Sequence, residues 1–496
     1  PLFPEPAHSP IVPSAGETVE VAIRPRDPDG ISDLTLHYSF DGGVWQDTAM
    51  TQGADGLWTG QIPGAGRTSG DQAQFYIEGE DSLGATATWP SSGEDSRALV
   101  RWDDGLALLQ VNGVEPTNFR ILMDDADAEW MHESGNAMSN DMLGTTVIIN
   151  EADVYYDVGV RIKGSPRGRT VPDRVGYSLR FPTDEPFMGI HERISVDRSG
   201  PDESTSVREI LFKHAVNHAA GGVPSTYDDV IRVIAPNRIG NEDSGVYFPN
   251  VATEAAPALL NRSRYDDELL GNQWEDGDDG EVFEYELIYR PAQTVDGNPE
   301  SLKLPRRGAT GSIYRQDFES IFGSTDKELY RWHWLIKNNR AEDRFDHLIE
   351  FVSTMGDRSN PDFHDDLRQL MDMDQWLRAV AFHILFGVSD SYTGSDFSVG
   401  LGHNMAIYFR PEDGKALFLP WDSDFAFKLS ATLPVSNHGQ LGDDLDALIQ
   451  DPGNKRLYYG HLLDIIATTF NTAYLGSWSS HYTDFSGGEN LTQFDS

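Results

Sequence analysis

The first hundred residues alternate between apolar and polar positions, which is the period of a half-buried β-strand. The alternation is clearest in four segments that short turns rich in Gly, Pro and Asp separate: "ETVEVAIRP", "LTLHYSF", "GLWTGQIP" and "AQFYIEGED". Short strands at this spacing are typical of antiparallel sandwiches. We therefore expect residues 1–98 to form an all-β immunoglobulin- or fibronectin-like sandwich, which the segment "PSSGEDSRALV" brings to an end.

From residue 99 onward, helical and strand periods are mixed, which predicts an α+β domain over 99–496. Its small α+β lobe is expected at about 105–255. The expected strands are "TTVIINEADVYYDVGVRIKG", "GYSLRF", "DVIRVIA" and "SGVYFP". A helix is expected where apolar residues recur at helical spacing before Gly221-Gly222, namely at Val207, Ile210, Leu211, His214 and Ala215. The segment "NQWEDGDDGEVFEYE" is interpreted as a solvated acidic excursion.

The C-terminal half is predicted to be a mainly helical lobe, at about 256–480. Ser324 is the expected N-cap of a helix through "DKELYRWHWLIKNN". A second helix, ending at Gly387, is expected to bury one face made of Leu377, Val380, Ala381, Ile384 and Leu385. The segment "RLYYGHLLDIIATTF" predicts a final helix.

Between these helices, two apolar runs predict a β-hairpin. The runs "MAIYF" (405–409) and "ALFLP" (416–420) are joined by "RPEDGK", in which Asp413-Gly414 supplies a left-handed corner. If Phe409 pairs with Ala416, then Asn404 lies opposite Trp421. The following residue, Asp422, is then one position beyond the ladder and close to Asn404.

This end of the hairpin gathers oxygen donors. An Asn amide and the carboxylates of Asp422 and Asp424 are suitable ligands for Mg²⁺ or Mn²⁺. Asp390 follows Gly387 in a long loop, where a carboxylate can accept a proton from an attacking hydroxyl. The alternative is that these aspartates cap turns, a role that Asp fills in many proteins.

Basic residues cluster elsewhere in an otherwise acidic chain. The segments "RIKGSPRGR" and "DRVGYSLRF" contribute Arg161, Lys163, Gly164, Arg167, Arg169, Arg174 and Arg180. Backbone N–H groups of a Gly-containing loop, together with basic side chains, can hold phosphates. An ordinary solvated loop remains the alternative.

Composition narrows the choice of partners. Lys and Arg total 38 against 80 Asp and Glu, and the net charge of −42 argues against nucleic acid or an anionic membrane as the main partner. The absence of cysteine excludes disulfides, thiol catalysis and Cys-ligated metals. No apolar run is long enough to predict a membrane span. In the sandwich, "RDPDGISDLTLHYSFDGGVWQ" makes Ca²⁺ a candidate ligand, although solvated turn aspartates are the favoured interpretation.

The order of several motifs resembles the spore coat protein H (CotH) kinase family of secreted or coat-associated atypical protein kinases. These motifs are "DVGVRIKGS", "GYSLRF", "SVREILFKHAV", "SGVYF", "MDMDQWLRAVAFHILFGVSD", "HNMAIYF" and "LFLPWDSDFAF". The resemblance covers about 105–475. It implies a two-lobed protein-kinase-like fold and transfer of phosphate from ATP, with Mg²⁺ or Mn²⁺, to Ser or Thr of other proteins outside the cytoplasm. Residues 1–98 resemble the fibronectin-type domains that often accompany such regions.

The resemblance also implies roles for particular residues. Asp390 corresponds to the catalytic aspartate, and the metal-binding residues correspond to Asn404, Asp422 and Asp424. Arg161, Lys163 and Gly164 match the family's R-x-(K/R)-G strand and loop, where nucleotide binding is expected.

The sequence departs from the family pattern at two positions. Arg174-Val175 stands where a phosphate-binding lysine is usual, and Val251 stands where a glutamate is common. Arg174 and Arg180 are then the expected phosphate-binding residues, and Glu209 is the expected partner of such a basic residue.

We therefore expect a metal-dependent phosphotransferase. A non-catalytic surface, adhesion or envelope-assembly protein that binds through the sandwich is the main alternative. A metal-dependent hydrolase that uses the same carboxylates is a third.

Overall fold

The computed structural model has a mixed α+β fold, as the sequence predicts. It describes residues 7–107, 115, 117–133, 136, 139–164, 175–197, 204–219, 221–236, 258–285, 325–331, 334–389, 391–393, 404–435 and 442–486. The chain divides into two compact units. Unit 1 consists of Pro1–Arg198 and Val230–Leu260, and unit 2 of Ser199–Asp229 and Asn261–Ser496. A kinase-like arrangement of two lobes, and the predicted boundary at residue 98, stay predictions.

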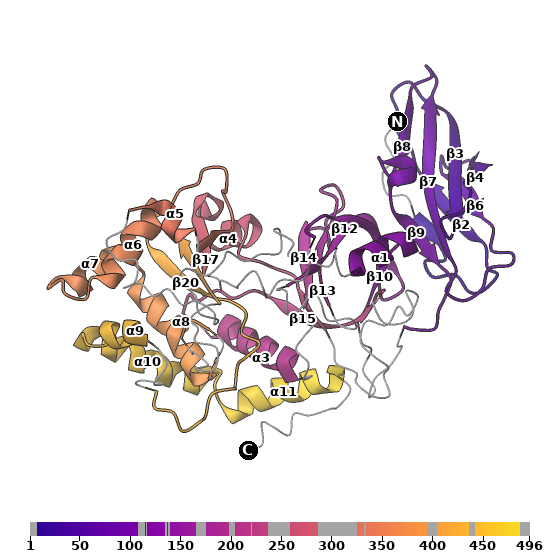
Figure 1. The fold of residues 1–496 in the computed structure, drawn as a ribbon. Helices are drawn as coiled ribbons and strands as arrows, with labels where there is room; N and C mark the ends of the chain where they lie inside the picture. The colour runs from indigo at the N-terminus through magenta and orange to yellow at the C-terminus, as the bar shows by residue number, and fades with distance from the viewer. Residues whose placement is uncertain are drawn as a thin grey trace. The chain divides into compact units, whose positions relative to one another are not determined.

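Unit 1 begins with two antiparallel sheets that share a core (Figure 1). One sheet has the strand order β1 (Ala7–Ser9), β2 (Val19–Ile23), β6 (Trp58–Ile62) and β5 (Thr51–Gln52). The other has the order β4 (Gln46–Ala49), β3 (Ile31–Phe40), β7 (Gln72–Asp81) and β8 (Thr86–Trp89), and β9 (Ala98–Arg101) also pairs with β7. Alternate residues such as Val19, Val21, Leu34 and Leu36 are fully buried between the sheets. The predicted strands are confirmed, and the immunoglobulin or fibronectin assignment stays a prediction.

The rest of unit 1 is a closed barrel, which the sequence did not predict. Its strand order is β10 (Asn118–Leu122), β11 (Leu143–Ile149), β12 (Asp153–Lys163), β13 (Gly176–Arg180), β14 (Arg193–Asp197), β16 (Ala258–Asn261) and β15 (Asp228–Ile234). A parallel pairing between β10 and β15 closes the ring. Along β12, Val158, Val160 and Ile162 are buried in the barrel core, whereas Arg161 and Lys163 alternate with them and are half-buried. Helix α1 (Asp125–His132) adds Ala128 and Met131 to this core.

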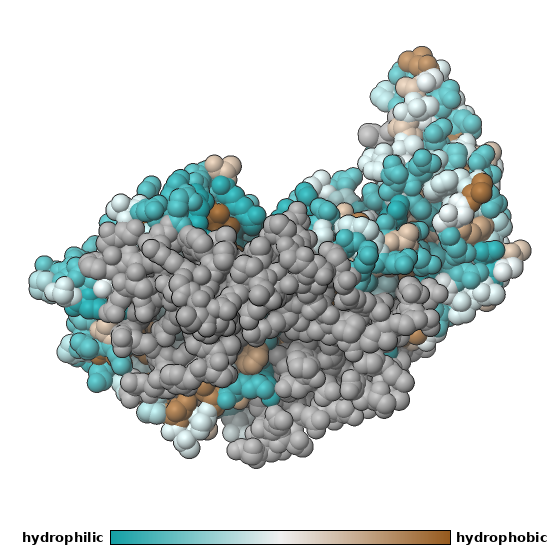
Figure 2. Space-filling model, viewed as in Figure 1, coloured by the Kyte–Doolittle hydropathy of each residue, from teal (hydrophilic) through white to brown (hydrophobic). Residues whose placement is uncertain are grey.

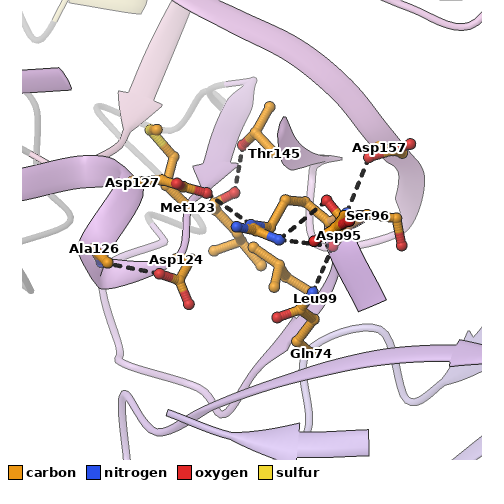
Figure 3. Close-up of polar contacts among 12 residues, drawn as sticks. Gln74, Asp95, Ser96, Leu99, Met123, Asp124, Ala126, Asp127, Thr145 and Asp157 are labelled. Carbon is orange, nitrogen blue, oxygen red and sulfur yellow. Dashed lines mark hydrogen bonds and ion pairs between the residues drawn. The ribbon is translucent and has the colours of Figure 1, made fainter. Parts of the chain in front are cut away.

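Side-chain and backbone contacts, as well as the covalent chain, connect the sandwich with the barrel. The Arg97 backbone N–H donates to Asp157 Oδ1 at 2.9 Å, and the Arg97 guanidinium pairs with Asp127 at 2.7 Å; both aspartates are labelled in Figure 3. The side chain of Tyr156, from β12, packs into the sandwich core against Phe75 and Trp89. Unit 1 therefore contains two sheet systems whose cores share a strand.

Unit 2 is built around one four-stranded antiparallel sheet. Its strand order is β18 (Trp334–Ile336), β17 (Glu281–Tyr285), β19 (Met405–Phe409) and β20 (Ala416–Pro420). One face carries Ile407, Phe409 and Phe418 into the large helical core, and the other carries Ala406 and Leu417 into a second cluster. The sheet therefore needs apolar cover on both faces.

Helices supply that cover. The described helices of unit 2 are α3 (Ser204–His218), α4 (Asp267–Gln273), α5 (Lys327–Tyr330), α6 (Asp346–Gly356), α7 (Phe363–Leu370), α8 (Met373–Leu385), α9 (Gly442–Leu448), α10 (Pro452–Thr468) and α11 (Thr472–Ser486). Helix α8 packs against both α10 and β20 (Figure 1). The predicted helices around 207–215 and 377–385 are confirmed, whereas α11 was not predicted. On the face shown in Figure 2, hydrophilic residues cover most of the described surface, in keeping with the acidic composition.

The structure corrects the interpretation of "GEVFEYE" as a solvated excursion. This segment forms β17, whose five residues are all buried and pair with strands on both sides. Its two glutamates tolerate burial because each has a cationic partner. Glu281 pairs with Arg344 at 2.9 Å, and Glu284 pairs with Lys337.

The structure also corrects the helix predicted through "DKELYRWHWLIKNN". Helix α5 contains only four residues, and its N-cap is Asp326, which accepts from the Glu328 N–H, rather than Ser324, which lies outside the described residues. The following Trp334–Ile336 pairs with β17 as β18. Aromatic and β-branched residues suit a strand once a neighbouring strand is present, so tertiary pairing overrides the helical pattern.

Candidate functional site

The end of the β19–β20 hairpin is arranged as the sequence predicts. The observed register pairs Phe409 with Ala416 and Met405 with Pro420, and Gly414 has the expected left-handed φ of 70°. Asn404 precedes one end of the last pair, and Trp421-Asp422 follows the other. The first prediction about the site, its register, is therefore confirmed.

Asn404 and Asp422 share an unusual backbone conformation. Their φ angles are 54° and 53°, in the left-handed region that Asn and Asp enter more readily than most other residues with a Cβ. Such conformations cost about 1–3 kcal/mol each and persist where the surroundings hold them. Both strands therefore turn sharply where they leave the ladder.

The donors at this end suit a hard divalent cation. The Asn404 side chain is buried, Asp422 is exposed and Asp424 is half-buried. Between the two aspartates, Ser423 is only 1% exposed, and its Oγ has no hydrogen-bond partner among the described residues. Amide, carboxylate and hydroxyl oxygens are the ligand types that Mg²⁺ and Mn²⁺ prefer, so the residues present fit such an ion.

Backbone hydrogen bonds hold the segment after Asp424 against the end of α8. The Ser389 N–H donates to the Phe425 carbonyl at 3.2 Å, and the N–H groups of Lys428 and Leu429 donate to the Gly387 carbonyl at 3.2 and 3.1 Å. Two parts of the chain that carry predicted site residues are thus joined. Asp390 itself lies outside the described residues, so its role stays a prediction.

Helix α8 also carries a buried histidine, His383, which the sequence interpretation did not consider. The ring is buried between Phe212 and Phe418, and its Nδ1 lies 2.8 Å from the Thr393 hydroxyl. Burial lowers the pKa of His383 to about 3, so the ring is neutral at physiological pH. A histidine inside an otherwise apolar helix face was the available signal.

The predicted nucleotide-binding residues of unit 1 that the structure describes lie on or beside β12 and β13. Lys163 pairs with Asp197 at 2.5 Å, and Gly176 lies between them on the middle strand. A Cβ at Gly176 would come within 2.8 Å of Lys163 Cγ, so glycine leaves the lysine room to cross the strand. Arg161 donates to Asn140 at 3.2 Å. Arg180 is exposed at the end of β13, and Gly164, with φ of 105°, directly follows β12.

Three residues of the predicted basic cluster, Arg167, Arg169 and Arg174, lie outside the described residues, and so does Val251, one of the two departures from the family pattern. What these two departures from the family pattern mean for phosphate binding therefore stays a prediction.

Glu209, in unit 2, belongs to a buried ionic cluster. The Lys213 ammonium lies 2.7 Å from Glu209 Oε1 and 2.7 Å from Asp228 Oδ2. Asn261 donates to the other Asp228 oxygen at 2.6 Å. Burial alone would lower the pKa of Lys213, but the carboxylates of Asp228 and Glu209 outweigh it and raise the pKa. The expected pairing of Glu209 with a phosphate-binding residue stays a prediction; the structure pairs it with Lys213, on the same helix.

The acidic loop of the sandwich brings three carboxylates together. Oxygen atoms of Asp27, Asp29 and Asp81 lie within 4.8 Å of one another. Asp81 Oδ1 already accepts from the N–H groups of Leu83 and Ala85, and Asp27 Oδ1 accepts from the Asp29 N–H. Turn capping thus accounts for these contacts, and calcium binding stays a prediction.

Comparison with known families defines unit 2 more closely. Residues 260–487, which include Asn404, Asp422 and Asp424, match a family model of kinase-like proteins. The family is described as CotH kinase protein, and the match covers slightly less than half of the chain. The resemblance seen in the sequence is therefore confirmed over that range.

Other comparisons are less informative. No curated protein matches the chain. Among solved structures, the Br derivative of BhCBM56 is 19% identical over 18% of this chain and 88% of its own, with a TM-score of 0.14. Two Listeria monocytogenes structures, an uncharacterized protein from strain EGD-e and a cycloalternan-forming enzyme, are 10% and 11% identical. Each covers 39% of this chain and 17% of its own, with a TM-score of 0.15. These TM-scores support no conclusion about fold or function.

A helix must contain about 20 predominantly apolar residues to cross a bilayer. Within the described ranges, no helix combines the length and the apolar composition that a membrane span requires.

Proposed function

We propose that this protein is a metal-dependent phosphotransferase that moves the γ-phosphate of ATP to Ser or Thr of proteins outside the cytoplasm. The observation that carries the proposal is the hairpin end, where Asn404, Asp422 and Asp424 offer oxygen ligands within a region of the CotH kinase protein family. Mg²⁺ or Mn²⁺, when bound, would neutralise phosphate charge.

The chain's own residues have distinct roles in this proposal. Asn404 and the carboxylates of Asp422 and Asp424 hold the cation. The left-handed φ angles of Asn404 and Asp422 set the positions from which these two side chains leave the backbone. Asp390 accepts the proton of the acceptor hydroxyl while the oxygen of that hydroxyl bonds to the γ-phosphorus. The bond from that phosphorus to the bridging oxygen breaks, and ADP leaves with the bonding electrons.

Transfer of label tests the proposal. The protein is incubated with γ-labelled ATP, Mg²⁺ or Mn²⁺ and a Ser-rich acceptor protein. We expect labelling of the acceptor, or of the protein itself, to disappear in Asp422→Ala and in Asp390→Ala. Asp413→Asn is the matched control, because Asp413 lies at the opposite end of the same hairpin and pairs with Arg410.

The outcomes separate the candidate functions. Equal labelling by wild type and both alanine variants would reject these residue roles. Loss of nucleotide without labelling of protein would favour a hydrolase. Calorimetry that detects no metal-dependent nucleotide heat would favour a non-catalytic scaffold.

A further inference from the structure

Tyr265 lies beside the end of β20, next to the residues that lead into Asp422, although no sequence motif pointed to it. It immediately precedes Asp266, the N-cap of α4, and is 5% exposed. Its ring packs with Ala406, Leu417 and Leu419 on the sheet face that α4 covers. Packing therefore holds the Tyr265 ring in place independently of the contacts that its hydroxyl makes.

The Tyr265 hydroxyl holds the end of β20. It donates to the Pro420 carbonyl at 2.6 Å, and its ring lies 5.9 Å from that of Trp421, centroid to centroid. Pro420 belongs to the last ladder pair, with Met405. Tyr265 thus contacts the two residues that lead into Asp422.

The hydrogen bond from Tyr265 to Pro420 lies at the point where the ladder of the hairpin ends. Beyond Pro420 the ladder has ended, and Asp422 must adopt its left-handed φ. A strained residue keeps its conformation only where the neighbouring structure holds it. Burial raises the pKa of Tyr265, so its hydroxyl remains a donor throughout the physiological range. The same oxygen lies 3.4 Å from the Pro224 carbonyl, which ties this point to the loop after α3.

We propose that Tyr265 is a positioning residue of the metal centre, whose hydroxyl fixes the end of β20 so that Asp422 presents its carboxylate to the cation. The inference rests on the proposed function, because it assumes that Asp422 is a metal ligand. Groups that orient metal ligands typically change metal affinity by about 10- to 100-fold when they are removed.

Tyr408 provides a matched control. It is fully buried, belongs to the same apolar cluster and donates its hydroxyl to the Gly277 carbonyl at 2.8 Å. Tyr408 lies inside β19 rather than beside its end, so its hydroxyl does not contact the residues that lead into Asp422. Tyr265→Phe and Tyr408→Phe each remove one buried hydroxyl that donates to a backbone carbonyl.

The experiment measures cation binding by calorimetry, with Mn²⁺ and then Mg²⁺ as the probes, in the presence of a non-hydrolysable ATP analogue. We expect Tyr265→Phe to weaken Mn²⁺ binding about tenfold. Tyr408→Phe should bind as wild type does, while urea unfolding shows similar destabilisation of both variants. Wild-type affinity in Tyr265→Phe, or equal weakening in both variants, would overturn the inference.

The inference and the proposed function fail in different ways. If the wild type binds no cation, the metal centre itself is rejected, and the positioning role falls with it. If the wild type binds cation but transfers no phosphate, phosphotransfer is rejected, and a selective loss in Tyr265→Phe still supports the positioning role. If the wild type does both and Tyr265→Phe is unchanged, only the inference is wrong.

Discussion

At the scale of single residues, the buried charge of Lys213 is matched by two carboxylates. The side chains of Lys213, Glu209 and Asp228 are all at most 7% exposed, and the Lys213 ammonium lies 2.7 Å from an oxygen of each carboxylate. The sequence suggested that Glu209 interacts with a basic group but did not identify Lys213, one helical turn away, as its partner. Helical spacing allows that pair, but only the fold brings in Asp228.

We expect Lys213→Met to destabilise the protein by about 3–5 kcal/mol, because two carboxylates would remain buried without their cation. Lys327→Met is the control, since Lys327 is 46% exposed and solvent screens its pair with Asp343, which should therefore contribute little to stability. Urea unfolding of both variants measures the difference. Similar losses in the two variants would contradict the assigned role of burial.

At the scale of elements, the sequence predicted structure well where the signal was local. The hairpin register follows from one turn and two apolar runs, so Asn404 and Asp422 could be paired in advance. The strands β17 and β18 could not be predicted, because each depends on a neighbour far away in the chain. The closed barrel was missed for the same reason. Its closing pair, β10 with β15, joins strands that are separated by more than 100 residues in the sequence.

Strand β12 leads to a second prediction, because it contributes to both cores of unit 1. Tyr156 packs into the sandwich, whereas Val158 and Val160 fill the barrel. Tyr156→Ala should lower the free energy of unfolding by about 3–5 kcal/mol. Hydrogen exchange should show lost protection in β7 and β12 together. Trp130→Ala, at a side chain that is 38% exposed, should have little effect. Loss of protection in one sheet system alone would show that the two systems unfold independently.

At the scale of the whole molecule, buried histidines make the stability of the fold depend on pH. Burial lowers the pKa of His8 to about 4 and that of His383 to about 3. Burial, with the neighbouring His218 and His481, lowers the pKa of His214 to about 4. All three are therefore neutral in the folded protein near pH 7. Since the unfolded chain binds protons at its histidines from about pH 6.5 downward, protonation favours unfolding.

We therefore expect stability to be greatest above about pH 6.5 and to fall as the pH approaches 4. His8 alone should account for roughly 3 kcal/mol at the acidic end. Thermal unfolding at pH 7 and pH 4.5, at constant ionic strength, measures the change. His8→Gln should show a smaller drop in Tm than wild type over the same interval. An identical drop would mean that carboxylates, rather than this histidine, set the acid sensitivity.

Strand β17 also has a consequence for the order in which unit 2 is assembled. Its glutamates enter the sheet paired with Arg344 and Lys337, and its neighbour β19 begins only at Met405. During synthesis on the ribosome, this strand emerges long before those partners exist. We therefore expect the nascent chain to keep β17 in water until the hairpin has been made, so that the sheet and its candidate cation-binding end form late and in a single event.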